Sequence, residues 1–74
     1  MPHVIVKTLA GKTEEQKVRL AEALANDVKA IFGSPDHAIS VAIEDVPPQE
    51  WDEKVYKPEI LSIWDKLYRK PHKK

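Results

Sequence analysis

Proline directly follows the first methionine, and this Met1-Pro2 start carries the clearest chemical potential in the sequence. Initiator methionine is usually removed before a small residue, which would leave Pro2 as a terminus with a free secondary amine. An ordinary terminal amine has a pKa of about 7.7–8.0, and an apolar wall or a nearby cation lowers this pKa. A neutral amine near pH 7 can act as a general base and afterwards as an acid. Many proteins begin with Met-Pro without any function for the proline. The residues around Pro2 therefore decide whether it is a credible base.

A rigid strand and a cation follow Pro2. Residues 3–9 are β-branched and apolar, which predicts a strand largely buried on both faces that would hold the amine in place. Lys12 follows in the short loop 10–12, as a cation that could sit near the substrate end of this strand. Alone, Lys12 would be read as a surface lysine, so it gains weight only together with Pro2.

Other polar residues favour structural interpretations. The histidines His3, His37 and His72 lack metal-binding spacing and the chain has no cysteine, so we expect no metal site. His3 suits a structural or interface role better than a catalytic one, because adjacent strand residues point to opposite faces. Glu44 and Asp45 could be paired acid–base carboxylates, but the same alternation favours a solvated strand end.

A long helix is expected after the loop. Thr13 and Gln16 match a capping box that begins a helix over residues 14–32, and Gly33 followed by Pro35 ends it. Apolar residues at three- and four-residue spacing predict its core-facing stripe. That stripe comprises Val18, Ala21, Leu24, Ala25, Val28, Ile31 and Phe32.

The rest of the chain predicts a second strand and a final helix. Residues 38–46 alternate, and strand, helix and strand of these lengths indicate a right-handed βαβ unit with parallel strands. Pro58 suits the first position of a C-terminal helix, whose expected stripe is Ile60, Leu61, Trp64, Leu67 and Tyr68. We expect one α+β domain over residues 1–74, with residues 70–74 as a frayed tail.

Length and charge restrict the function classes. Seventy-four residues give a marginal core, and twelve Lys and Arg balance twelve Asp and Glu. This balance argues against nucleic acid or anionic membrane as partner, and without a spanning stretch or a signal peptide we expect a cytoplasmic protein. Two strands with one covering helix leave both sheet edges and one face open. We therefore expect oligomerisation, at least to a dimer, to complete the sheet.

The opening Met-Pro-His-Val-Ile-Val-Lys-Thr-Leu-Ala-Gly-Lys-Thr-Glu-Glu-Gln-Lys resembles that of the 4-oxalocrotonate tautomerase family. Residues 34–46 are similar to the family's second strand. Val-Pro-Pro-Gln-Glu-Trp and the helix after it are similar to a longer-chained branch that tends to be dimeric. The resemblance implies a β-α-β subunit with one long crossover helix and an enol–keto tautomerase, an isomerase that needs no metal or organic cofactor.

The resemblance also implies site residues. Pro2 matches the proton-transferring base, and Lys12 stands where the family commonly has a substrate-binding arginine. Ser40 stands in place of a second arginine, and Trp51 lies where the family has an aromatic pocket wall near the proline. Lysine keeps the charge but loses bidentate carboxylate recognition. These departures favour a small-molecule monocarboxylate enol such as phenylenolpyruvate over a dicarboxylate.

The sequence leaves other functions open. The chain could be a non-catalytic oligomeric binding domain of the same fold, or a promiscuous hydratase or dehalogenase of unsaturated acids. A retained Met1 would make Pro2 a tertiary amide and abolish the mechanism. A dimer is favoured over a hexamer, because the long C-terminal segment could cover the surface that shorter relatives use to build hexamers.

Overall fold

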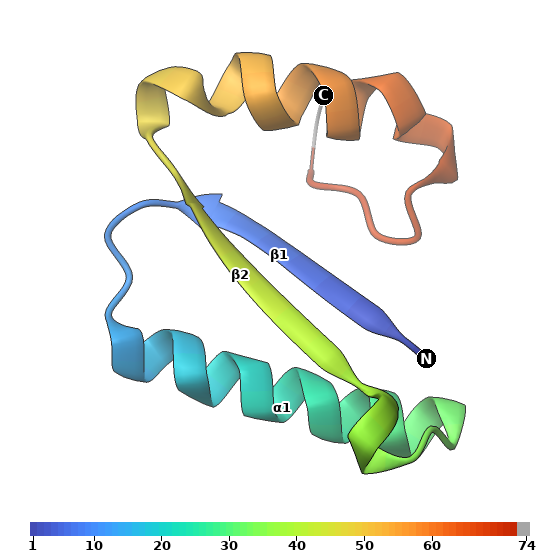
Figure 1. The fold of residues 1–74 in the computed structure, drawn as a ribbon. Helices are drawn as coiled ribbons and strands as arrows, with labels where there is room; N and C mark the ends of the chain where they lie inside the picture. The colour runs from blue at the N-terminus through green and yellow to red at the C-terminus, as the bar shows by residue number, and fades with distance from the viewer. Residues whose placement is uncertain (73–74) are drawn as a thin grey trace.

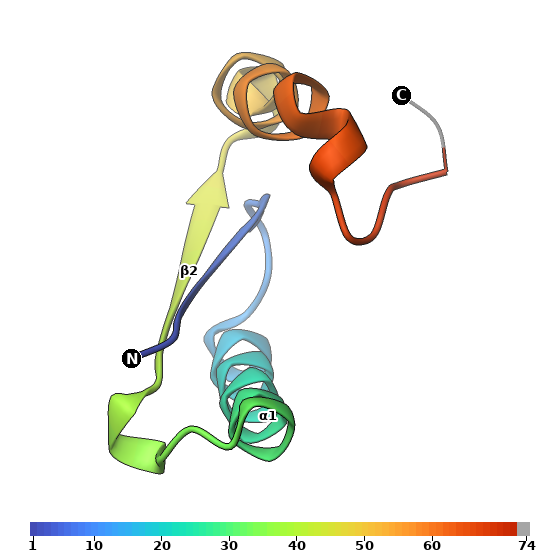
Figure 2. The ribbon, with the colours of Figure 1, turned by 90° about the vertical axis from the view of Figure 1, so that its right-hand side faces the viewer.

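The computed structural model describes residues 1–72 and arranges them in three layers, with a parallel two-stranded sheet between two helical layers (Figure 1). The elements in chain order are β1 (His3–Leu9), α1 (Glu14–Phe32), η1 (Asp36–Ala38), β2 (Ser40–Val46), η2 (Pro48–Glu50), η3 (Asp52–Ile60) and η4 (Leu61–Lys66). The expected β-α-β unit is confirmed. Figure 2 shows α1 on one side of the strands and the C-terminal helical segment on the other.

The two strands run parallel and in register from His3 opposite Ser40 to Leu9 opposite Val46. Strand β1 has the expected bounds, whereas β2 begins two residues later than expected. The difference arises because Ala38 ends the short helical turn η1, in which the Ala38 N–H donates to the Pro35 carbonyl at 3.0 Å. The N-terminal ends of both strands therefore lie side by side, and so do their C-terminal ends.

Helix α1 begins and ends where its capping signals predict. The Gln16 N–H donates to Thr13 Oγ1 at 3.1 Å, and the Thr13 N–H donates to Gln16 Oε1 at 2.9 Å, which completes the capping box. At the other end Gly33 adopts φ 73°, a left-handed conformation that glycine tolerates without steric cost. Its N–H donates to the Lys29 carbonyl at 3.0 Å.

The apolar stripe of α1 is wider than the sheet beneath it. Only its middle is half-buried, at Ala21, Leu24, Ala25 and Val28. The prediction that the whole stripe faces a core is wrong for the single chain, since Val18 is 58% exposed and Phe32 is 73% exposed. Burial of β1 on both faces is likewise wrong, because Ile5 remains 53% exposed. Two strands are too narrow to cover these side chains.

The C-terminal segment differs from its prediction. Pro58 lies inside η3 instead of opening a helix, and η3 is wound with wide π-type turns. In an ordinary α-helix the proline ring would clash with the carbonyl four residues earlier, and the wider turn avoids that clash. Leu67 and Tyr68 lie beyond η4, and Tyr68 is fully exposed, so the expected stripe ends before them. Of the expected tail, residues 73 and 74 lie outside the described residues.

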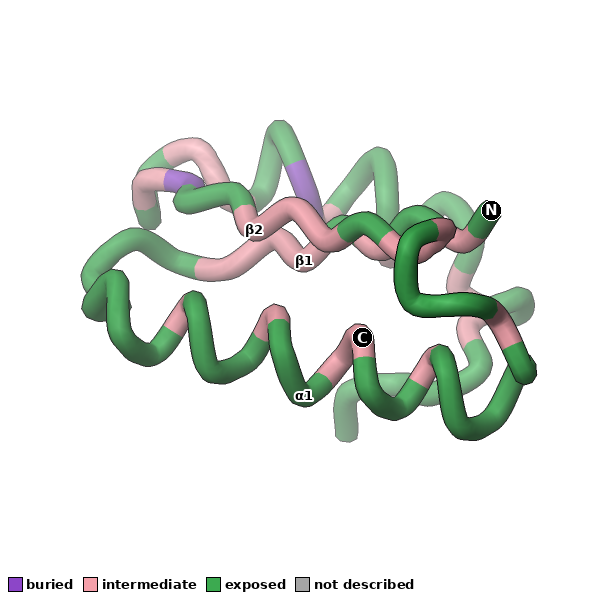
Figure 3. The backbone as a smooth tube through the Cα atoms, turned by 60° about the horizontal axis from the view of Figure 1, so that its bottom comes forward, coloured by how far each residue is buried: buried purple, intermediate pink, exposed green. Residues whose placement is uncertain are grey.

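Burial is concentrated between the sheet and the C-terminal segment. Among residues 1–72 only Val46 and Val55 are buried, with 7% and 5% exposure, and they come from the end of β2 and from η3 (Figure 3). Helix α1 is largely exposed in the same view. No helix within this described part of the chain has the length and apolar character to cross a bilayer. So small a core agrees with the expectation that further copies cover the remaining apolar surface.

Candidate active site

Pro2 and Ser40 lie together where the two strands begin. The Pro2 carbonyl accepts a hydrogen bond from the Ser40 N–H at 3.2 Å, which fixes the half-buried Pro2 to the neighbouring strand. Met1 before it is fully exposed, so nothing in the fold holds the methionine in place. Loss of Met1 would expose the Pro2 nitrogen on a rigid backbone, the arrangement that a general base needs.

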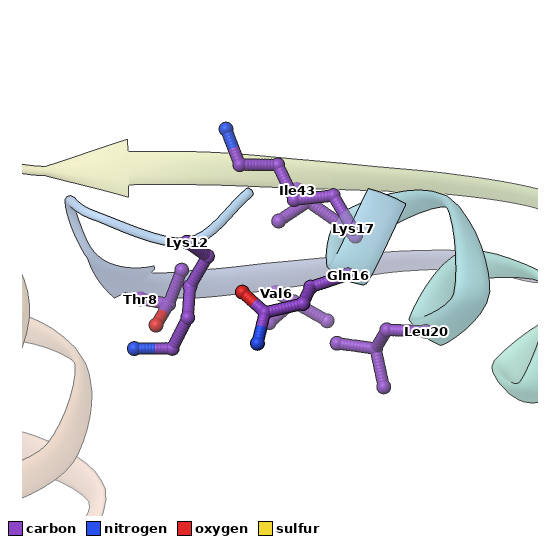
Figure 4. Close-up of a pocket in the computed structure, with 7 residues that line it drawn as sticks. All are labelled: Val6, Thr8, Lys12, Gln16, Lys17, Leu20 and Ile43. Carbon is purple, nitrogen blue, oxygen red and sulfur yellow. The ribbon is translucent and has the colours of Figure 1, made fainter. Parts of the chain in front are cut away.

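Lys12 lies at the other end of β1, in the loop that follows the C-terminal end of this strand. It borders a recess of about 250 Å³ between β1, β2 and the first turns of α1. Figure 4 shows the side chains around this Lys12 recess, which are Val6, Thr8, Lys12, Gln16, Lys17, Leu20 and Ile43. The recess therefore combines an apolar floor with cationic and amide groups at its rim.

The two lysines of the Lys12 recess differ in their partners. Lys17 Nζ lies 2.6 Å from Asp45 Oδ2 and 3.5 Å from Glu14 Oε1. The hydrogen bond with Asp45 raises the pKa of Lys17 above its ordinary value, with desolvation opposing it and the charges of Asp45 and Glu14 adding to it. Within residues 1–72 no carboxylate pairs with Lys12. Lys12 is therefore the cation of this recess that is available to an anion.

Trp51 lies on the other side of the sheet. It borders a second recess of about 310 Å³ with Ile5, Lys7, Val55, Glu59 and Ile60. The hydrogen bond with Glu59 raises the pKa of Lys7, with desolvation opposing it and nearby Glu44 adding to it. Because Glu59 neutralises Lys7, this second recess offers an apolar aromatic wall without a free cation.

The four expected site residues are therefore not assembled by one chain. Pro2 and Ser40 lie at the N-terminal ends of the strands, whereas Lys12 follows the C-terminal end of β1 and Trp51 follows that of β2. The recesses of Lys12 and Trp51 have different linings, one formed with α1 and the other with η3. A site that uses all four residues would therefore need a second copy of the chain.

The alternative candidates occupy structural positions. Asp45 pairs with Lys17 on the α1 side, whereas Glu44 lies 3.9 Å from Lys7 on the η3 side. These two carboxylates thus face opposite ways, as expected, and do not form an acid–base pair. His37 is exposed in η1. No group of three metal-ligating side chains gathers within the described residues 1–72.

One polar contact near Pro2 is absent from the sequence-based account. His3 Nδ1 lies 2.7 Å from Ser40 Oγ. Each of these residues opens its strand, and the parallel register places them opposite one another. The sequence signal for this contact was that both residues lie at the start of strands expected to pair. The register of the pairing, which decides whether the two residues meet, cannot be read from either strand alone.

Comparison with known proteins identifies related chains. A family model described as "Tautomerase enzyme" matches residues 2–52. A "Probable tautomerase" of Xylella fastidiosa (strain 9a5c) is 41% identical over 71 residues, which cover 96% of this chain and 87% of that protein. "Tautomerase PptA" of Pectobacterium carotovorum subsp. carotovorum (strain PC1) is 42% identical over 72 residues, covering 96% of this chain and 95% of that protein.

A solved structure shows the same fold. It is a heterohexameric 4-oxalocrotonate tautomerase from Chloroflexus aurantiacus J-10-fl, with a TM-score of 0.66 and 35% identity. The match covers 69% of this chain and 82% of that one. The family model ends at residue 52, where η3 begins, while the two bacterial relatives extend over nearly the whole chain. The C-terminal helical segment thus lies outside the family model but within the part shared with those relatives.

Proposed function

The chain belongs to the tautomerase enzyme family and is an isomerase of the tautomerase type, and we propose that it interconverts the enol and keto forms of small 2-oxo acids with Pro2 as base. The observation that carries the proposal is the position of Pro2. The Pro2 carbonyl is hydrogen-bonded to the Ser40 N–H just before β1, and the Met1 that precedes Pro2 is fully exposed. Removal of that methionine converts a non-basic amide into a basic secondary amine.

The proposed reaction moves one proton between oxygen and carbon. The neutral Pro2 nitrogen takes the proton of the enol hydroxyl, and an electron pair of the oxygen then forms the carbonyl. The electrons of the carbon–carbon double bond take a proton from the Pro2 ammonium, so that this proton is now bound to carbon. The reverse sequence returns the enol. Negative charge develops on the enolate oxygen between the two steps, so a cation or a hydrogen-bond donor near that oxygen would lower the barrier.

Lys12 supports a substrate with one carboxylate. It is the cation of its recess without an ion-pair partner among the described residues, and apolar side chains lie beside it. An ammonium binds a single carboxylate as a point charge, whereas bidentate recognition would call for arginine. We therefore propose a monocarboxylate with an apolar tail, such as phenylenolpyruvate, as the substrate class.

The distance between Pro2 and Lys12 supports a site shared by two copies. The seven residues of β1 and two loop residues separate them, and an extended strand of seven residues spans about 20 Å. A small 2-oxo acid is too short to touch both ends. In a two-fold symmetric pair, one copy presents Pro2 while its partner, running in the opposite direction, presents Lys12. The open edges of the two-stranded sheet allow such a pairing.

We further propose that the assembly is a homodimer, located in the cytoplasm. The C-terminal segment lies on the sheet side opposite α1, where Val55 is buried and Glu59 pairs with Lys7. A segment in this position leaves the sheet edges free but obstructs stacking of further copies on that face. Sedimentation equilibrium should give about 17 kDa, twice the chain mass of 8.4 kDa. A hexamer mass would contradict the homodimer.

A comparison of substrates tests the proposed chemistry. Processed protein, shown by its intact mass to lack Met1, would be assayed by ultraviolet absorbance with phenylenolpyruvate and with the dicarboxylate 2-hydroxymuconate. We expect a higher kcat/KM for phenylenolpyruvate. A clear preference for the dicarboxylate, or turnover confined to hydration or dehalogenation of unsaturated acids, would contradict the proposed substrate class.

A further inference from the structure

A histidine–serine pair lies beside Pro2 at the start of the sheet. His3 Nδ1 and Ser40 Oγ are 2.7 Å apart, and the Ser40 N–H donates to the carbonyl of Pro2 at 3.2 Å. Ser40 is therefore bound at two points, through its backbone to Pro2 and through its hydroxyl to His3. Both members of the pair are exposed. An exposed hydrogen bond between neutral groups adds little to stability, because water satisfies both partners in its absence.

The direction of the hydrogen bond determines which group remains free. If the Nδ1–H of His3 donates to Ser40 Oγ, the hydroxyl keeps its own proton for a further acceptor. In the other tautomer the hydroxyl donates to Nδ1, and only the Nε2–H of His3 is left as a donor. The two cases place the free donor on different residues, and substitutions can distinguish them.

We propose that His3 is a positioning residue, whose Nδ1–H holds the Ser40 hydroxyl so that its proton points to the developing enolate oxygen of the substrate at Pro2. This inference rests on the proposed function of Pro2. Ser40 then supplies a neutral hydrogen-bond donor at the oxygen, while Lys12 of the other copy binds the carboxylate. A fixed donor is more effective than a freely rotating hydroxyl, because it needs no reorganisation as charge develops.

Asparagine and glutamine provide the decisive substitutions at His3. The side-chain amide of asparagine places an N–H near the position of Nδ1, whereas that of glutamine places one near Nε2. His3→Asn should therefore keep kcat/KM for phenylenolpyruvate within about threefold of the original enzyme, and His3→Gln should lower it about tenfold. Ser40→Ala should lower it about tenfold as well, chiefly through kcat, and adding His3→Gln to Ser40→Ala should cost nothing more. His37→Asn is the matched control.

The possible outcomes distinguish the proposed role of His3 from the proposed function of Pro2. Rescue by asparagine but not glutamine, with non-additive effects at Ser40, supports the positioning role. Rescue by glutamine alone would overturn it, since His3 would then contact the substrate through Nε2. Equal rates in all His3 variants, or a changed oligomer mass at unchanged kcat/KM, would also overturn it and assign His3 to packing. If turnover by the original enzyme does not depend on Pro2, the proposed function itself is wrong.

Discussion

Pro2 and Lys12 lie at opposite ends of β1, although the proposed reaction uses both. The seven-residue strand between them is extended and paired along its length with β2, so it cannot fold back to bring them together. If the proline amine and the lysine ammonium act on one substrate, they must come from two copies. We therefore propose that association completes both the sheet and the catalytic site.

Subunit exchange should restore activity between two impaired variants when the substrate concentration is well below KM. One copy carries Pro2→Ala and the other Lys12→Ala, and under this condition neither alone should turn over phenylenolpyruvate efficiently. A mixed dimer contains one site with both changes and one site with neither. Random 1:1 exchange makes about half of the dimers mixed, so about a quarter of the original activity should return. Exchange would be promoted by mild denaturant and verified by native mass spectrometry.

The same mixture distinguishes a shared site from one contained in a single chain. If each site were contained in a single chain, every site in the mixture would still carry one of the two substitutions, and mixing would restore no activity. Mixed dimers that form but recover no activity would therefore refute the sharing of sites.

Lys12 should act mainly on substrate binding. Lys12→Ala removes the cation that lacks an ion-pair partner in residues 1–72, and it should raise the KM for phenylenolpyruvate about tenfold to a hundredfold. Lys12→Arg keeps the charge and should retain most of the affinity. Lys54→Ala, which removes an exposed lysine of η3, is the matched control. Steady-state kinetics would reveal the effect, and an unchanged KM in Lys12→Ala would exclude Lys12 from the site.

The Lys17–Asp45 ion pair should give stability that disappears in alkali. The pKa of Lys17 in the folded chain is raised above its ordinary 10.5 by the hydrogen bond with Asp45. A raised lysine pKa contributes stability that is complete below the ordinary value and is lost as the pH rises through the folded value. The difference in unfolding free energy between the original protein and Asp45→Asn should therefore be constant near neutral pH and shrink above about pH 10.5.

Chemical denaturation at a series of pH values measures this difference. Asp27→Asn removes an exposed carboxylate of α1 and is the control, with no alkaline change relative to the original protein expected. A difference for Asp45→Asn that stays constant through pH 11.5 would show that the ion pair does not carry it.

Local signals in the sequence predict β1 and α1 closely. The β-branched residues 3–9 define β1, and the Thr13–Gln16 capping box with Gly33 defines both ends of α1. These signals act within a few residues, so they survive without knowledge of the tertiary fold. By contrast, Lys12 was expected near the substrate end of the first strand, whereas the structure places it beyond the end of β1 that lies away from Pro2.

Features that depend on distant contacts were not predictable. Residues 49–56 are polar with one tryptophan, and their sequence left open a short helix or a turn. The helical winding of η3 is accompanied by the burial of Val55, which shares a recess with Ile5 and Lys7 of β1, and by the Lys7–Glu59 ion pair. The exposure of Phe32 follows from the two-strand width of the sheet in one chain. The His3–Ser40 contact follows from strand register. Each of these needs the arrangement of segments far apart in the sequence.

Ketonisation of phenylenolpyruvate by protein whose intact mass shows that Met1 is absent tests the role of the Pro2 amine most directly. The Pro2→Ala variant, processed in the same way, should be slower by at least about a hundredfold, since it loses the ring-fixed secondary amine. A preparation that retains Met1 should be as slow, because its Pro2 nitrogen is an amide. Equal rates in the original and Pro2→Ala proteins, or rates no faster than buffer, would contradict proline-based tautomerisation of this substrate.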